Sequence, residues 1–208
     1  MPLFALWRDL EPPPDDAEQE TAMYRNVSAT SWFPDVLWHR SYGIDAPGRV
    51  RGFCIYEGPS AAAVVEQSRF CGVPFVGIKQ VEEHRAPGVG AGPDEIPAEM
   101  ALYLLEWLIP TRRPPNEVWR ALTNSLSEPP AVKWIRSFFD AESGASRCIL
   151  LVESQAAVEA AVPAGAKTDR LERMWLSHPA TWAHLYDSMG LPHHWEAAAT
   201  VTSLPHVV

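Results

Sequence analysis

Two arginines of this chain each lie between aromatic residues at alternating positions, a pattern that could bind a negatively charged group. The first group is Trp38, Arg40 and Tyr42, and the second is Trp134, Arg136 and Phe138. Because alternate side chains of a strand point to the same face, each arginine is expected to share a face with its aromatic neighbours. Burying an unpaired cation is costly. Each guanidinium therefore needs an acid, such as Glu57 or Glu106, or an anionic ligand.

These two groups predict a ligand-binding surface in which aromatic rings flank the cations. The expected ligand-binding residues are Trp38, Arg40, Tyr42, Tyr56, Trp134 and Arg136. The alternative is a structural network, in which ion pairs and aromatic packing satisfy the arginines within the protein. Both alternatives make the arginines more important than any histidine of the chain.

His39 and Cys54 are the candidate metal ligands. His39 is expected on the face opposite Arg40, and Ile135 takes its place in the second group, so a metal ligand is not repeated. Imidazole is a good ligand for nickel, and a deprotonated thiol binds soft metals. A small apolar thiol suits a sheet core equally well, and this alternative applies to Cys54 and to its counterpart Cys148.

Four histidines near the C-terminus form a second place where metal could bind weakly: His178, His184, His193 and His194. No pair of them has the spacing of a zinc motif next to an acid, which favours solvated side chains. Because Ile135 takes the place of His39 in the second half of the chain, any bound metal is expected in the first half or on this tail. The chain has no Cys-x-x-Cys, no His-Glu-x-x-His and no glycine-rich phosphate loop.

The elements that position these residues occur twice. Trp134 follows Trp38 by 96 positions, and Cys148 follows Cys54 by 94, so two strands and the turn between them are repeated. In the first copy we expect strands at 3–10, 36–42, 50–56 and 75–82 and helices at 15–32 and 61–70. In the second copy we expect strands at 101–109, 131–139, 147–153 and 170–176 and helices at 115–126 and 154–162.

This order, βαββαβ in each copy, predicts an α+β protein of two tandem ferredoxin-like repeats. One face of each antiparallel sheet needs a cover, so we expect the two sheets to pack face to face as a pseudo-dimeric α+β barrel. The expected boundaries are repeat 1 at 1–84, a proline- and glycine-rich linker at 85–98, repeat 2 at 99–177 and a tail at 178–208 with one short helix.

Composition narrows the class of protein. A net charge of −9 disfavours nucleic-acid binding, which needs a cationic face. No apolar run reaches the roughly 20 residues of a membrane span, and the N-terminus does not read as a secretory signal. Three cysteines do not make a disulfide framework, so we expect free thiols and a cytoplasmic protein. The expected assembly is a monomer with an internal pseudo-dimer, or a homodimer.

Three motifs resemble a known family: Trp38-x-Arg-Ser-Tyr42, the strand end at 53–60, and Cys71-Gly-Val-Pro74. The chain resembles the small bacterial ferredoxin-like domains known as nickel-binding proteins, formerly a domain of unknown function. The resemblance covers nearly all of residues 3–83. The second copy shares Trp134-x-Arg-Ser-Phe138 but then diverges. The resemblance implies nickel binding and pairing through the sheets.

Two classes of function follow. The first is a protein that binds a metal, nickel or another divalent transition metal, or that binds a small molecule. The alternative is an enzyme with its active site in the cleft between the two sheets, which rests on analogy between folds.

Overall fold

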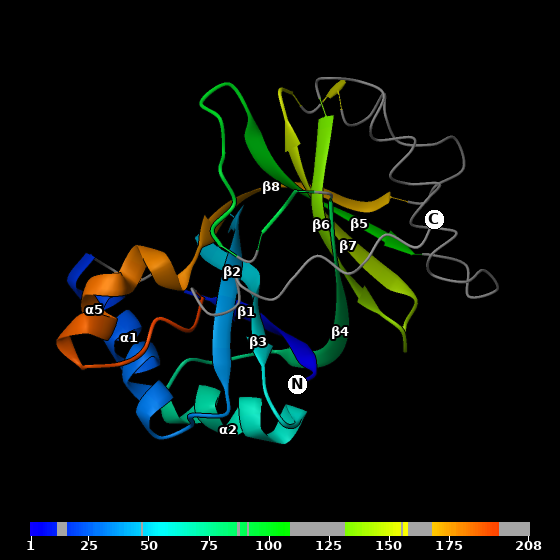
Figure 1. The fold of residues 1–208 in the computed structure, drawn as a ribbon. Helices are drawn as coiled ribbons and strands as arrows, with labels where there is room; N and C mark the ends of the chain where they lie inside the picture. The colour runs from blue at the N-terminus through cyan, green and yellow to red at the C-terminus, as the bar shows by residue number, and fades with distance from the viewer. Residues whose placement is uncertain are drawn as a thin grey trace.

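In a computed structural model of the chain, eight antiparallel strands close into a barrel (Figure 1). The structure describes residues 1–11, 16–46, 48–86, 88–90, 92–108, 132–154, 156–157 and 168–195. The strands are β1 (Leu3–Leu10), β2 (Leu37–Ala46), β3 (Arg49–Glu57), β4 (Gly77–Arg85), β5 (Ala101–Leu108), β6 (Val132–Asp140), β7 (Ala145–Val152) and β8 (Thr168–Ser177).

The order of strands around the barrel is β1-β3-β2-β8-β5-β7-β6-β4. Strands β4-β1-β3-β2 come from the first copy, and β6-β7-β5-β8 from the second, each in ferredoxin-like order. The two sheets join where β2 pairs with β8 and where β4 pairs with β6. The predicted α+β class and the barrel of two sheets are confirmed. Closure leaves neither sheet with an unpaired edge.

Helices lie outside the first sheet and near the tail (Figure 1). Helix α1 (Asp16–Ser28) continues into a 3-10 turn, Ala29–Ser31, and α2 (Ala61–Phe70) begins after Ser60, whose hydroxyl accepts from the Ala63 N–H at 3.2 Å. A 3-10 turn, Pro179–Trp182, leads into α5 (Ala183–Ser188). The expected helix at 115–126 and most of that at 154–162 lie outside the described residues. No described helix is long and apolar enough to cross a membrane.

Two apolar cores lie on the two sides of the barrel wall. The interior core is filled by aromatic and branched side chains, among them Tyr42, Phe53 and Phe138. The outer core lies between the first sheet and α2, where Trp38 and Tyr56 pack near Val64. The three cysteines are buried and free.

The same β-bulge occurs in both copies and changes which residues face inward. On β2, Trp38 pairs with Tyr56 and Arg40 with Ile55, so His39 is the extra residue. On β6, Trp134 pairs with Leu150 and Arg136 with Ile149, so Ile135 is the extra residue. A bulge inserts one residue into a strand and breaks the simple alternation of faces.

Two predictions about faces are therefore wrong. Trp38 does not share a face with Arg40 and Tyr42, because the bulge turns it into the outer core. His39 is not opposite Arg40, because the same bulge directs both side chains to one cavity. The bulge also explains the repeated Trp-x-Arg-Ser motif. The indole N–H of Trp38 donates to the Ser41 hydroxyl at 2.9 Å, and that of Trp134 donates to Ser137 at 2.7 Å.

Candidate functional site

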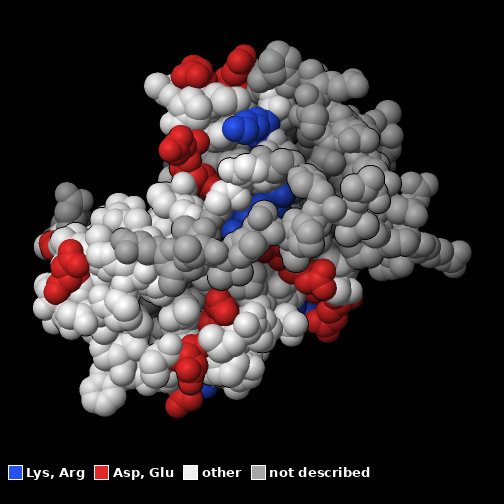
Figure 2. Space-filling model, viewed as in Figure 1, with Lys and Arg blue, Asp and Glu red and all other residues white. Residues whose placement is uncertain are grey.

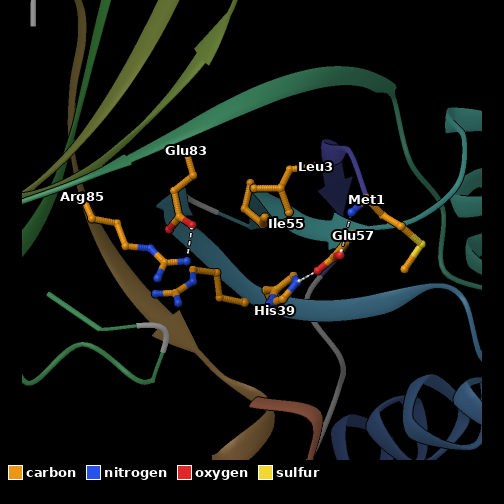
Figure 3. A pocket seen from close by; sticks show the side chains of 8 residues that line it. Met1, Leu3, His39, Ile55, Glu57, Glu83 and Arg85 are labelled. Carbon is orange, nitrogen blue, oxygen red and sulfur yellow. Dashed lines mark hydrogen bonds and ion pairs between the residues drawn. The ribbon is translucent and has the colours of Figure 1, made fainter. Parts of the chain in front are cut away.

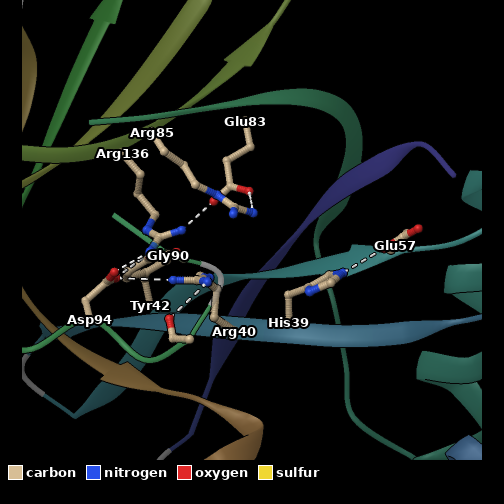
Figure 4. A network of polar contacts seen from close by, with 10 residues as sticks. His39, Arg40, Tyr42, Glu57, Glu83, Arg85, Gly90, Asp94 and Arg136 are labelled. Atoms are coloured by element: carbon tan, nitrogen blue, oxygen red, sulfur yellow. Dashed lines mark hydrogen bonds and ion pairs between the residues drawn. The ribbon is translucent and has the colours of Figure 1, made fainter. Parts of the chain in front are cut away.

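The two repeated arginines converge on one acid of the linker, Asp94 (Figure 4). Arg40 donates to Oδ2 of Asp94 at 3.3 Å, and Arg136 donates to Oδ1. The side chains of Arg40, Arg136 and Asp94 are 2%, 0% and 1% exposed. The Tyr42 hydroxyl also donates to Oδ2, at 3.4 Å. The expected pairing of the arginines with an acid is confirmed, but the acid is neither Glu57 nor Glu106.

Glu83 and Arg85 of β4 extend this network on the side of Arg136. Arg136 donates to Oε1 of Glu83 at 2.5 Å, and Arg85 donates to Oε2 at 2.6 Å. Burial alone would raise the pKa of Glu83. The hydrogen bond from Arg85 and the charges of Arg136 and Arg40 outweigh burial and lower that pKa to about 2. Burial opposes the charge of Arg136 as well, yet Tyr42, Asp94 and Glu83 raise its pKa.

A cavity of about 350 Å³ opens at the end of the barrel beside this network (Figure 3). We call it the mouth cavity. It is lined by Met1, Leu3, His39, Arg40, Ile55, Glu57, Glu83 and Arg85. Apolar residues form one part of its wall, and a histidine, two acids and two arginines form the rest. This combination of an apolar wall with a few charged groups is typical of small-molecule sites.

His39 is held in the mouth cavity by Glu57. Nε2 of His39 lies 3.0 Å from Oε2 of Glu57, whose Oε1 accepts from the amino group of Met1 at 3.2 Å. Burial would raise the pKa of Glu57, but these two donors lower it, so the carboxylate is charged. Burial lowers the pKa of His39 in spite of Glu57, which favours the neutral ring. A charged acceptor at Nε2 assigns the ring proton to Nε2 and leaves Nδ1 as the basic nitrogen.

The structure brings together only part of the predicted ligand-binding surface. Arg40, Tyr42 and Arg136 meet at Asp94, whereas Trp38 and Tyr56 lie in the outer core. The indole N–H of Trp134 donates to the Ser137 hydroxyl. These aromatic residues support the barrel wall and do not line the mouth cavity.

The two candidate metal ligands are also apart. Cys54 lies in the outer core, where its sulfur accepts from Arg8 Nε at 3.1 Å. His39 lies in the mouth cavity and pairs with Glu57. Among the described residues there is no group of three or more His, Cys, Asp or Glu side chains that could hold a metal ion.

The tail histidines take part in packing contacts. His194 lies with Nε2 2.8 Å from the Trp38 carbonyl oxygen, and its ring is 6.2 Å from that of His39. His193 stacks on Trp195 with ring centroids 4.6 Å apart, and Nδ1 of His178 accepts from the Ala180 N–H at 3.1 Å. His184 is exposed on α5. The tail therefore packs against β2 and does not supply a metal cluster in its described part.

Sequence reasoning missed three charged residues of this region: Asp94, Glu83 and Arg85. Asp94 belongs to the linker and has no counterpart in the repeat, so no pattern marked it. Glu83 and Arg85 alternate along β4, which was predicted to end at 82. The surface charge of the visible face does not mark the site clearly. Acidic side chains are scattered over this face, and basic ones show mainly near its middle (Figure 2).

No family model and no curated protein match the chain. The resemblance to the nickel-binding family therefore gains no support from these comparisons. The predicted ferredoxin-like strand order is supported by the barrel itself. Among solved structures, the chain is similar to a putative monooxygenase from Lactobacillus acidophilus, with a TM-score of 0.45 and 11% identity over 84% of this chain and 93% of that one.

Two further solved structures are similar to the chain. One is a putative monooxygenase from Fusobacterium nucleatum, with a TM-score of 0.46 and 8% identity over 85% and 94% of the two chains. The other is an anthrone oxidase-like protein, with a TM-score of 0.42 and 12% identity over 85% and 93%. At such values, the chemistry of this chain has to be argued from its own residues.

Proposed function

We propose that the chain is an enzyme that binds a small anionic molecule in the mouth cavity and removes a proton from it, with His39 as the base. One observation carries the proposal: a histidine oriented by a carboxylate lines the same cavity as Arg40 and Arg85. A base, the group that orients it and a cation for the developing charge are the parts that proton abstraction requires.

His39 supplies the basic nitrogen. Glu57 accepts the Nε2 proton, so the lone pair of the neutral ring is on Nδ1, and the proton from the substrate would be taken up there. The lowered pKa of His39 keeps the ring neutral near neutral pH, which a base requires. Once His39 is protonated, the Glu57 carboxylate stabilises the imidazolium charge.

Arg85 and Arg40 supply positive charge for the substrate. The side chain of Arg85 is 38% exposed, so it can reach a molecule that enters from solvent, whereas Arg40 is buried in the wall. The volume of about 350 Å³ lies at the small end of the range for ligand pockets. Small 2-oxo acids combine a carboxylate with an acidic C–H bond, and they are the first substrates to test.

The second class is a binding protein that uses the same cavity without catalysis, which its apolar wall and two arginines also support. Nickel binding is supported less well. A metal at His39 would find Glu57 as a second donor, and the described residues supply no group of three.

Proton abstraction is tested by incubating small 2-oxo acids with the protein in D₂O and following deuterium incorporation by NMR. We expect exchange that His39→Gln slows by about 100-fold or more, and that Glu57→Gln slows by a smaller factor. His184→Gln is the matched control, because His184 is exposed on α5. Exchange that is unchanged in His39→Gln would contradict the role of His39. Binding without exchange, lost in Arg85→Ala, would favour the binding protein.

A further inference from the structure

A cluster of buried charges lies beside the mouth cavity, where the two repeats meet. Arg40 comes from β2 and Arg136 from β6, and both follow the same bulge in their own copy. The two guanidinium groups converge on one carboxylate, that of Asp94, and each of them binds a different oxygen (Figure 4). Two guanidinium groups on one carboxylate make strong, charge-assisted hydrogen bonds in a buried setting.

The carboxylate and the arginines come from very different kinds of structure. The arginines are on strands of a closed barrel, whereas Asp94 is on the linker, whose described residues 88–90 and 92–100 form no helix or strand. The linker adds two backbone acceptors, the Gly90 carbonyl at 3.3 Å from Arg136 and the Gly92 carbonyl at 3.5 Å from Arg40. The cations are thus built into the fold, and the anion is brought to them by a connecting segment.

Charge in this region favours an additional anion. Three guanidinium groups, of Arg40, Arg85 and Arg136, share two carboxylates, of Glu83 and Asp94. Removal of the Asp94 charge alone would leave three cations with a single acid. A small anion that replaced the Asp94 carboxylate would restore the balance.

We infer that Arg40 and Arg136 form a carboxylate-binding site that Asp94 occupies as an internal ligand, and that a free small carboxylate takes its place when Asp94 is removed or displaced. This inference does not depend on the proposed proton transfer. It assigns a ligand class, small monocarboxylates, to a pair of residues 96 positions apart in the sequence.

The internal ligand sets the affinity for a free one. A group attached to the same chain competes at an effective concentration in the millimolar range or above. Arg40 also lines the mouth cavity, so a carboxylate that enters there meets an arginine already bound to Asp94. The linker would then act as a built-in competitor, and an external carboxylate would bind the wild-type chain more weakly than a chain without the Asp94 side-chain acid.

Chemical rescue tests this inference. Asp94→Ala removes the carboxylate and leaves a space that formate fits. With about 100 mM formate and a Kd of about 10 mM, the folding equilibrium shifts about 10-fold and the melting temperature rises by about 3–6 °C. Acetate should stabilise the variant less than formate, and propionate less again, because the space is small. Sodium chloride at equal ionic strength should not reproduce the effect, and wild type should respond to formate at least 10-fold more weakly.

Two controls keep the test decisive. Asp94→Asn keeps the volume filled by a neutral amide, so formate should not stabilise it, and Asp94→Ala with Arg136→Met should lose most of the rescue. If Asp94→Ala does not fold alone, the yield of refolding in formate against chloride gives the same comparison. Equal effects of formate and chloride, or equal formate affinity in wild type and Asp94→Ala, would overturn the inference.

Discussion

The two repeats present the same arginine in different surroundings. Both copies have the bulge, the Trp-to-Ser hydrogen bond and an arginine directed to Asp94. They differ at the extra residue of the bulge, which is His39 in the first copy and Ile135 in the second. They differ also at the end of the next strand, where Glu57 is matched by Leu151 in the second copy.

This difference confines a titratable pair of side chains to one half of the duplicated barrel. His39 and Glu57 form a polar pair in the mouth cavity, whereas Ile135 and Leu151 are part of the interior apolar core. The bulge and the arginine are shared by both copies, and in each copy the bulge precedes an arginine that binds Asp94. The unshared pair supplies the titratable group. Variants at equivalent positions of the two copies test whether the copies differ in this way.

Loss of an arginine should have the largest effect, and the effect should be unequal. Arg136→Met takes one partner from each of two acids, the partly buried Glu83 and the buried Asp94, and we expect a loss of about 3–5 kcal/mol in unfolding free energy. Arg40→Met leaves Asp94 bound to Arg136, so we expect a loss of about 1.5–3 kcal/mol.

Urea unfolding measures both losses, provided that the slope with denaturant is unchanged. Arg69→Met, on the exposed side of α2, is the control and should change little. A larger loss for Arg40→Met than for Arg136→Met would show that Arg40 contributes more than Arg136 to the unfolding free energy.

Exchange of the extra residues between the two bulges should be the next largest effect. Ile135→His places an imidazole in the apolar core, where Leu151 takes the place of Glu57, at a cost of about 2–3 kcal/mol. His39→Ile removes a partly exposed pair with Glu57 and should cost about 1 kcal/mol or less. Thermal or urea unfolding of both variants tests this, and similar losses would mean that the two sites are equivalent.

The Trp-to-Ser hydrogen bonds should show where the copies are alike. Ser41→Ala and Ser137→Ala each remove the acceptor of a partly buried indole N–H, and we expect each to cost about 1 kcal/mol. The two losses, measured by urea unfolding, should agree within about 0.5 kcal/mol. A loss confined to one copy would show that the bulge is held by other contacts in the second.

The duplication made most of the fold predictable. Repeated strands and helix signals are local features, and the register of Cys54 with Cys148 followed directly from the sequence. The bulge was not foreseen, because pairing across strands decides which residue is extra. A signal was present nevertheless: Trp and Ser three positions apart share a face only if alternation is broken, and both copies carry that spacing.

The site was less predictable than the fold. Two buried arginines indicated that an acid or a ligand must meet them, and the prediction of an acid is confirmed. Its identity as Asp94 depends on the path of the linker, which has no regular periodicity and no counterpart in the repeat. The pairing of His39 with Glu57 depends on the bulge as well, since without it His39 would face the outer core.

The smallest expected effect concerns pH, and it tests whether His39 is neutral when folded. Burial lowers the pKa of His39 below the ordinary value of 6.5, so the unfolded chain binds more protons at this position as the pH falls below that value. Protonation therefore favours unfolding, and stability should fall between about pH 7.5 and about pH 5.5. His84 and His194 have lowered pKa values too and act in the same direction, so wild type alone cannot isolate His39. Glu57 and Glu83, with lowered pKa values, act at lower pH.

The difference between wild type and His39→Gln isolates the contribution of His39, because the other groups remain in both. Urea unfolding at the two pH values should show that the variant loses less stability on acidification than wild type does. A variant that loses more would mean that His39 gains a proton on folding, held by Glu57 as an ion pair. His39 would then carry a positive charge near neutral pH and could not act as the base, so this measurement bears directly on the asymmetry between the two repeats.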